Sequence, residues 1–317
     1  MKRWWMCFFT YIIILLLCWS LAEANDKSSR AHLFNLIIRE GLGSIAVGDM
    51  NTTLKSINSI YDVVRSYHPE RCVGEITEIP NNYVDWEVGL QWTISSGFII
   101  GVAVSGQTRF HDRSFLTYTN MDFGLPLTEN NTYDSEIKVS MPIRLNVYRS
   151  YSILPKLNLL LNGGLGYYQA RLVQSLTLEV RYPVNYRAIE INDFDVSGRR
   201  IGVHCGAGLE YKFNDRFSML VEGQYNFSRV RHFSGTSRMT VWEYDNQGNF
   251  VGSNSQSTQG ILYHYIGVDP SVGALHEKLV VSERPPEVGN DPGSHLREAF
   301  LDLRGFALGF GLKIRLF

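Results

Sequence analysis

The residues with the chemistry for proton transfer are histidines and carboxylates placed in two segments of alternating polarity. His204 and Glu210 occupy the polar side of one segment, and Glu222 occupies the polar side of the next. An imidazole held near carboxylates can serve as a general acid or base in a hydrolase. The sequence places no nucleophile beside His204, so a hydrogen-bonded histidine without catalytic function is the better interpretation. We therefore expect this protein not to be an enzyme.

Motifs for metals, nucleotides and nucleic acids are also missing. The eight histidines are scattered, and neither H-E-x-x-H nor C-x-x-C occurs. Gly202, Gly206 and Gly208 are spaced as closely as the glycines of a nucleotide-binding loop. Such a loop is followed by a helix, whereas here the alternating segment continues. The formal net charge is -1, which is not the balance of a nucleic-acid-binding protein. We expect no cofactor, no metal site and no nucleic-acid partner.

Alternation of apolar and polar residues is the main structural signal. In GFALGFGLKIRLF, residues 305 to 317, every second residue back from Leu316 is apolar, and alanine, glycine or a cation lies between. Six earlier segments alternate in the same way: VDWEVGLQW, FIIGVAVSGQTRF, IKVSMPIRLNV, LNLLLNGGLGY, IGVHCGAGLEYKF and FSMLVEGQYNF. Each has about the ten residues that a tilted β-strand needs to cross a bilayer.

A soluble antiparallel sandwich also alternates, and three features favour a membrane barrel over it. Short connections (94–97, 149–156, 214–216) alternate with long ones (48–82, 114–134, 180–195, 234–295), as periplasmic turns and extracellular loops do. Aromatic residues, among them Trp92, Phe98, Phe110 and Phe306, gather at the segment ends. Charge mixed with glycine on the polar side suits a narrow lumen. The expected fold is an all-β, antiparallel, up-and-down transmembrane barrel, with the sandwich as the alternative.

The N-terminal residues have the pattern of an export signal. Lys2 and Arg3 precede an apolar run to Leu21, and the small residues Ala22 and Ala24 follow it. This predicts a signal peptide over residues 1 to 24 and a barrel domain over residues 25 to 317. An uncleaved membrane anchor is the alternative, because the apolar run is slightly long for a signal.

The signal peptide, the alternating strands and the ending GLKIRLF resemble the OmpA-type outer-membrane β-barrels of Gram-negative bacteria. The resemblance covers the predicted mature chain in pattern and includes no long specific motif. It implies an outer-membrane location, contact with outer-membrane lipid, and insertion by the barrel-assembly machinery, which reads the last strand. We expect no peptidoglycan-binding domain, unlike the larger family members. The implied insertion signal comprises Gly311, Leu312, Ile314, Leu316 and Phe317; Leu316 takes the lipid-facing place that an aromatic residue usually has in this family.

An even strand count requires an eighth strand before Gly48, where residues 32 to 47 alternate least cleanly. The expected strands cover residues 32–47, 83–93, 98–112, 136–148, 157–172, 199–213, 217–233 and 299–316, with both termini in the periplasm. Asp49 should cap a short amphipathic helix in the first loop, with Leu54, Ile57 and Tyr61 at helical spacing. Residues 245 to 248 predict a turn between strand extensions.

Charged residues on the polar faces of the strands should form ion pairs inside the barrel, because a buried charge is tolerated only when it is paired. Glu222 in particular should meet a cation from the last strand or from across the lumen. The predicted lumen network comprises Glu87, Arg109, Lys138, Arg144, Glu210, Lys212, Glu222, Lys313 and Arg315.

Three functions fit this interpretation. The first is a non-enzymatic outer-membrane barrel with a structural or surface-interacting function, whose long extracellular loops bind an extracellular ligand or an envelope protein. The second is a small channel, although eight strands enclose a space about wide enough for side chains alone. The third is a barrel hydrolase or acyl-transfer enzyme, for which we find no nucleophile.

Overall fold

The computed structural model describes residues 33–121, 126–182, 186–268, 275–287 and 294–316, and the predicted signal peptide and Phe317 lie outside them. The described chain is all-β except for one long helix and one 3-10 turn. Its elements are β1 (Leu33–Ser44), β2 (Val47–Gly48), α2 (Asp49–Tyr67), η1 (Pro69–Arg71), β3 (Cys72–Glu75), β4 (Asn82–Ser95), β5 (Phe98–Ser105), β6 (Gln107–Asn120), β7 (Leu127–Leu154), β8 (Leu157–Arg181), β9 (Arg187–Lys212), β10 (Phe217–Phe227), β11 (Arg229–Val230), β12 (Ser234–Tyr244), β13 (Phe250–Val268), β14 (Leu275–Ser282), β15 (His295–Glu298), β16 (Leu301–Asp302) and β17 (Gly305–Arg315).

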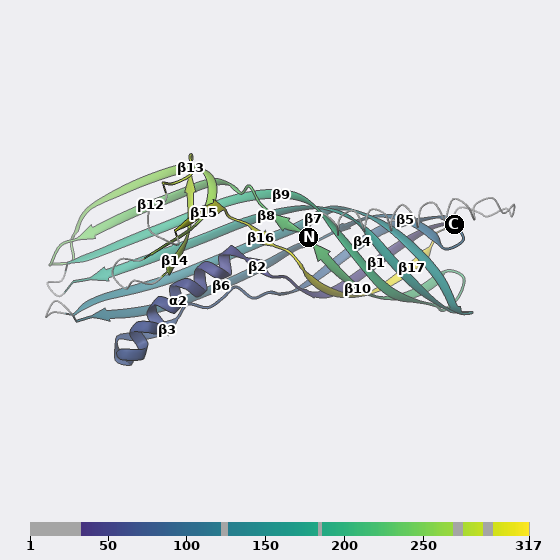
Figure 1. The fold of residues 1–317 in the computed structure, drawn as a ribbon, viewed down its shortest axis with the longest axis horizontal. Helices are drawn as coiled ribbons and strands as arrows, with labels where there is room; N and C mark the ends of the chain where they lie inside the picture. The colour runs from purple at the N-terminus through teal and green to yellow at the C-terminus, as the bar shows by residue number, and fades with distance from the viewer. Residues whose placement is uncertain (1–32, 122–125, 183–185, 269–274, 288–293, 317) are drawn as a thin grey trace.

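Antiparallel pairings join part of this sheet into a ring. The order around the ring is β1, β4, β5, β7, β8, β9, β10 and β17, and β17 pairs again with β1. The closing register runs from Asn35 opposite Arg315 to Gly43 opposite Ala307 without a shift. The crossing strands of this ring occupy the right half of Figure 1. The first and last described strands therefore complete the ring together.

The expectation of only eight strands is wrong, because the described chain has seventeen strand segments. Two of the expected long loops, 114–134 and 180–195, are mostly strand: β6 and β7 extend into the first, and β8 and β9 into the second. The 28 residues of β7 span about 90 Å at ~3.3 Å per residue, roughly three times the hydrocarbon thickness of a bilayer. The fourth expected loop contains β12, β13 and β14, and β15 begins at its last residue. The turn at residues 245 to 248 is confirmed, with the Gly248 N–H donating to the Asp245 carbonyl over 3.0 Å.

Two interruptions change which residues face the interior. The β7 register against β8 shifts between Ser140 and Ile143, so Ile137 is fully buried although it was expected on the lipid side. Pro142 lies in this bulge, where its missing N–H is tolerated. Gly106 separates β5 from β6, and Phe110 beyond it is buried. Phe98 is also buried, so neither phenylalanine belongs to an aromatic girdle.

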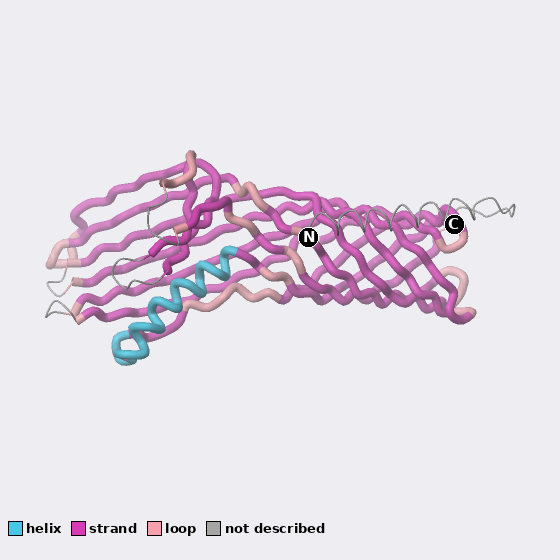
Figure 2. Tube along the Cα trace, in the orientation of Figure 1, coloured by secondary structure: helices cyan, strands magenta, loops and turns pink. Residues whose placement is uncertain are grey.

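Beyond the ring, β6 to β9 continue as one sheet with β12 and β13, and α2 lies against this extension (Figures 1 and 2). The extension has its own apolar core, to which Met50 and Leu54 of α2, Phe233 and Leu262 contribute. The helix is confirmed, but its N-cap is Gly48 and Asp49 is its first residue. The Asp49 carboxylate accepts hydrogen bonds from Arg297 and from the Phe300 N–H, which anchors the helix start to the end of the fourth loop.

A small three-stranded sheet of β2, β11 and β16 lies where the ring meets the extension, and we call it the plug. Val47, Val230 and Leu301 each contribute a fully buried side chain to it. Asp302 is buried beside them and accepts hydrogen bonds from Arg229 over 3.0 Å and from Arg304. The plug therefore joins three segments that are distant in the sequence.

Replacing Asp302 with asparagine should lower the free energy of unfolding by about 1 to 3 kcal/mol, because two cations lose a charged acceptor. Burial alone would raise the pKa of Asp302, but the hydrogen bonds from Arg304 and Arg229 outweigh it and hold the pKa below its ordinary value. The carboxylate thus contributes stability above the ordinary aspartate pKa of about 3.9, and loses it as pH falls further. Urea titrations of both proteins should differ at pH 7 and converge in strong acid. A constant difference across this range would contradict the assignment.

Candidate ligand cavity within the strand ring

Four charged side chains meet in the middle of the ring, and we call them the charged quartet: Arg39, Glu87, Arg144 and Glu222. Arg39 Nη2 donates to Glu87 Oε1 over 2.7 Å, and its Nη1 lies 2.9 Å from Glu222 Oε1. Arg144 Nη1 donates to Glu87 Oε2 over 2.6 Å. All four side chains are less than a tenth exposed. Two positive and two negative charges balance, which is the condition for holding them out of water.

Neutral polar groups complete the surroundings of the quartet. Gln224 Nε2 donates to Glu222 Oε1 over 2.6 Å, and Asn162 also donates to this oxygen. Arg144 Nε donates to His204 Nε2 over 3.1 Å. Glycine on the neighbouring strand β17 makes the space, because a Cβ on Gly309 would lie 2.8 Å from Arg39 Cδ. His204 is thus a hydrogen-bonding residue within the ring.

Two further layers close the lumen toward the turns that join the ring strands. Ile37, Leu160 and Leu220 form a buried apolar cluster next to the quartet. Beyond it, Lys313 Nζ lies 3.0 Å from Glu210 Oε1, and both side chains are largely buried. Alternating layers of charge and hydrocarbon leave little room for a water-filled path along the axis.

The other residues of the predicted network are not in the lumen cluster. Arg109 and Lys138 both pair with Glu136 on the outer side of the sheet, Lys138 over 2.7 Å. Their placement follows from the interruptions at Gly106 and at residues 140 to 143, which reverse the phase of β6 and β7. Lys212 and Arg315 are half-buried at strand ends and form no ion pair with a described residue.

Arg39 is the central residue that the sequence reasoning missed. Asn35, Ile37 and Arg39 face inward while Phe34, Leu36 and Ile38 face outward, so β1 alternates regularly. The apolar inward residue Ile37 concealed this, because its neighbours on both sides are also apolar. Counting in steps of two from Asn35 to Arg39 and Gly41 would have located the cation.

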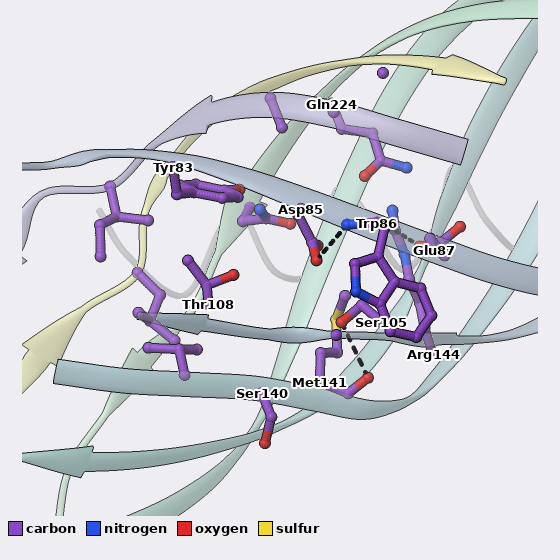
Figure 3. Close-up of a pocket in the computed structure, with 18 of the residues that line it drawn as sticks. Tyr83, Asp85, Trp86, Glu87, Ser105, Thr108, Ser140, Met141, Arg144 and Gln224 are labelled. Atoms are coloured by element: carbon purple, nitrogen blue, oxygen red, sulfur yellow. Dashed lines mark hydrogen bonds and ion pairs between the residues drawn. The ribbon is translucent and has the colours of Figure 1, made fainter. Parts of the chain in front are cut away.

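A cavity of about 80 Å³ lies beside the quartet, between it and the plug. Arg39, Arg144 and Asp85 contribute polar walls, and Tyr83, Phe110, Met141 and Tyr168 contribute apolar ones. Figure 3 shows Tyr83, Asp85 and Thr108 around this space, with Arg144 bonded to Glu87 at one side. Arg144 is only 4% exposed, yet its Nη2 has no hydrogen-bond partner among the described residues. One residue of the cavity wall therefore has a free buried donor.

The wall of the ring is incomplete next to this cavity. Among the described strands, residues 82 to 85 of β4 have a partner only on the β1 side, and residues 107 to 114 of β6 only on the β7 side. A groove on the outer surface follows this break and is lined by Leu42, Val84 and Phe306, among others. Tyr83 and Thr108 line both the groove and the cavity, so the two are adjacent.

The described residues contain no group of three or more metal-binding side chains. Ser105 lines the cavity, but its hydroxyl donates to the Met141 carbonyl, and His204 is not a lining residue. The site offers hydrogen bonds and apolar contacts for a bound molecule. Among the described residues, no helix has both the length and the apolar character needed to cross a membrane.

Comparison with known proteins identifies no family. No family model and no curated protein matches the sequence. Among solved structures, the chain is similar to outer membrane protein AlkL (9% identity, 92% of this chain and 93% of that chain, TM-score 0.31). It is also similar to the outer membrane protease OmpT from Escherichia coli (12%, 91% and 99%, 0.27) and to a major outer membrane protein from Thermus thermophilus (12%, 89% and 99%, 0.25). Similarity at this level assigns neither fold nor function to the chain.

Proposed function

We propose that this protein is a non-enzymatic β-barrel of the bacterial outer membrane that is closed to axial flow and acts through its extracellular extension. One observation carries the proposal: large apolar side chains cover the outside of the ring. They include Phe34, Ile38, Leu42, Val84, Leu90, Val102, Leu145, Leu165, Ile201, Val203, Leu209, Met219, Phe306, Leu308, Phe310 and Leu312, each exposed by more than a third. An exposed apolar surface that surrounds a whole ring marks contact with lipid.

The direction of insertion follows from the unequal ends of the ring. The turns at one end are short, whereas the other end continues into the extension with α2 and the plug. Short periplasmic turns and long extracellular segments are the rule for such barrels. Both termini then lie in the periplasm, and the lipid-facing Leu312 and Leu316 remain in place for the proposed insertion signal, which the barrel-assembly machinery would read.

The extension is the part that would meet an extracellular ligand or an envelope protein. Its sheet and helix enclose a packed core, so it presents a folded surface to a partner. An enzyme is the weaker candidate, because the hydroxyl of Ser105, which lines the cavity, donates to the Met141 carbonyl and not to a carboxylate or a histidine. A channel is also weaker, because the charged quartet and the layers beside it fill the ring.

Planar bilayer recordings test this function. The purified protein should show no stable conductance steps, because the buried layers of Arg39, Ile37 and Lys313 occupy the lumen. The same preparation should migrate differently on gels before and after boiling, which demonstrates a folded barrel. Regular conductance steps from heat-modifiable protein would make the channel the correct function. Identical gel mobility before and after boiling would contradict the proposal that the protein is a membrane barrel.

A further inference from the structure

The break in the ring wall lies at the level of the lipid head groups. Trp86 lies at the end of the break where β4 begins to pair with β5. Its indole packs over Gly106, where any added Cβ would clash with the indole Nε1, and the Gly106 N–H donates to the Trp86 carbonyl over 3.1 Å. Glu40, the partner of Trp86 on β1, is exposed on the outer face of the ring. Tryptophan prefers the membrane interface, and an exposed carboxylate is excluded from hydrocarbon. The break above Trp86 is therefore at or just outside the edge of the apolar layer.

The break also leaves strand edges that need a polar partner. The backbone groups of residues 82 to 85 and 107 to 114 that face across it make no strand pairing with any part of the chain that the structure describes. The rings of Tyr83 and Phe110 meet across it, edge to face, with centroids 5.9 Å apart. Unpaired edges are not tolerated in hydrocarbon, so water or the polar part of a ligand must occupy this opening.

Polarity changes in one direction from the outer groove to the cavity. Leu42, Val84 and Phe306 line the groove and are exposed on the outer face of the ring. Tyr83 and Thr108 stand at the opening, and Asp85 and Arg144 lie inside. This order matches a molecule with an apolar chain and a polar head, the chain along the groove and the head in the cavity. The cavity volume of about 80 Å³ admits a head group of a few atoms.

The charges around the cavity select the head group. Arg39 and Arg144 give two positive charges, and Glu87, Glu222 and Asp85 give three negative ones, so the sum is -1 (2 − 3). The two arginines are already paired with the two glutamates. Asp85 accepts a hydrogen bond from the Trp86 N–H over 2.8 Å and has no ion pair among the described residues. A carboxylate ligand would face this excess negative charge without a free cation.

We infer that the cavity binds the uncharged hydroxyl head group of a single-chain amphiphile, which enters sideways from the membrane through the break between β4 and β6. The hydroxyl accepts from the unpartnered Arg144 Nη2 or donates to the Asp85 carboxylate, which a hydrocarbon cannot do. The inference rests on the proposed membrane location. It adds a ligand site within the ring to the proposed extracellular surface.

Quenching of Trp86 fluorescence tests this site, because bromine quenches an indole only at close contact. The protein is placed in lipid nanodiscs with its other tryptophans replaced by phenylalanine, and 2-bromodecan-1-ol is titrated. Trp86 should be quenched in a saturable manner. A matched protein in which Trp92, at the other end of the same strand, is the sole tryptophan should show only gradual quenching from partition into lipid. Half-quenching of Trp86 should need at least about tenfold less probe, the ratio expected from one productive polar contact.

Three variants and a second probe define the outcome. Thr108→Phe should abolish saturable quenching by filling the opening, whereas Val104→Phe on the lipid-facing side of β5 should leave it unchanged. In the otherwise unaltered site, 2-bromodecanoate should bind at least about tenfold more weakly than the alcohol, and Asp85→Asn should reduce this difference by removing the repelling charge. Equal quenching of Trp86 and Trp92, or equal binding of alcohol and carboxylate, would overturn the inference. If the heat-dependent gel shift persists in that case, the proposed function stands; if the shift is absent, both fail.

Discussion

Arg39→Ala is expected to lower the free energy of unfolding by about 3 to 5 kcal/mol, the cost of removing one partner from a buried ion pair. Arg39 contacts both Glu87 and Glu222, so its loss leaves Glu222 without a cation and places two buried carboxylates near each other. Urea unfolding of the refolded protein in detergent, followed by tryptophan fluorescence, measures the change.

Arg315→Ala is the matched control, because Arg315 is a half-buried arginine at the end of β17 without an ion pair to a described residue. It should cost less than about 1 kcal/mol. Gln224→Ala is not a neutral control, since Gln224 donates to Glu222 over 2.6 Å. Equal unfolding midpoints for Arg39→Ala and Arg315→Ala would show that the quartet is solvated and contributes little to stability.

Phe233→Ala should have an effect of similar size for a different reason. Phe233 is completely buried in the core of the extension, where the backbone of Gly198 approaches its ring closely. Truncating a buried phenylalanine typically costs about 3 to 5 kcal/mol, from lost apolar burial and from the cavity that remains. Limited proteolysis should then cut the extension faster, while the heat-dependent gel shift of the ring persists.

Phe310→Ala is the comparison for this second prediction. Phe310 is exposed on the outer face of the ring, where lipid can replace the contacts of its side chain. Its truncation should cost clearly less stability than that of Phe233. If both variants lose the same stability in a chemical denaturation series, the extension has no packed core of its own.

Strand phase could be predicted from the sequence wherever a strand runs without interruption. The lipid-facing residues of β8, β9, β10 and β17 follow from the alternation alone, because period-two placement is a local property. The phase reversals on β6 and β7 could not be predicted in this way. They depend on where Gly106 and the 140–143 bulge fall relative to neighbouring strands, and pairing register is not local.

The strands of the extension could not be predicted for a related reason. Residues 114–134 and 180–195 alternate less visibly, because their outer faces are polar and their inner faces include residues such as Ser135 and Gln174. The candidate site shows the same limit. Glu87, Arg144 and Glu222 could be identified from the sequence as inward-facing charges. The break next to the cavity could not, because it exists where the described strands β4 and β6 do not pair, and strand pairing is not visible in a sequence pattern.

The plug has a consequence for the order of assembly. Val47 of β2 comes from near the start of the described chain, and Leu301 of β16 comes from near its end. The core around them, which includes Met50 and Leu303, cannot form until the final segment has been delivered to the same side of the membrane. Contacts of such large sequence separation are slow to form. Pairing of β17 with β1 and completion of the plug are therefore both late events, and a chain that stalls before Leu301 would lack both.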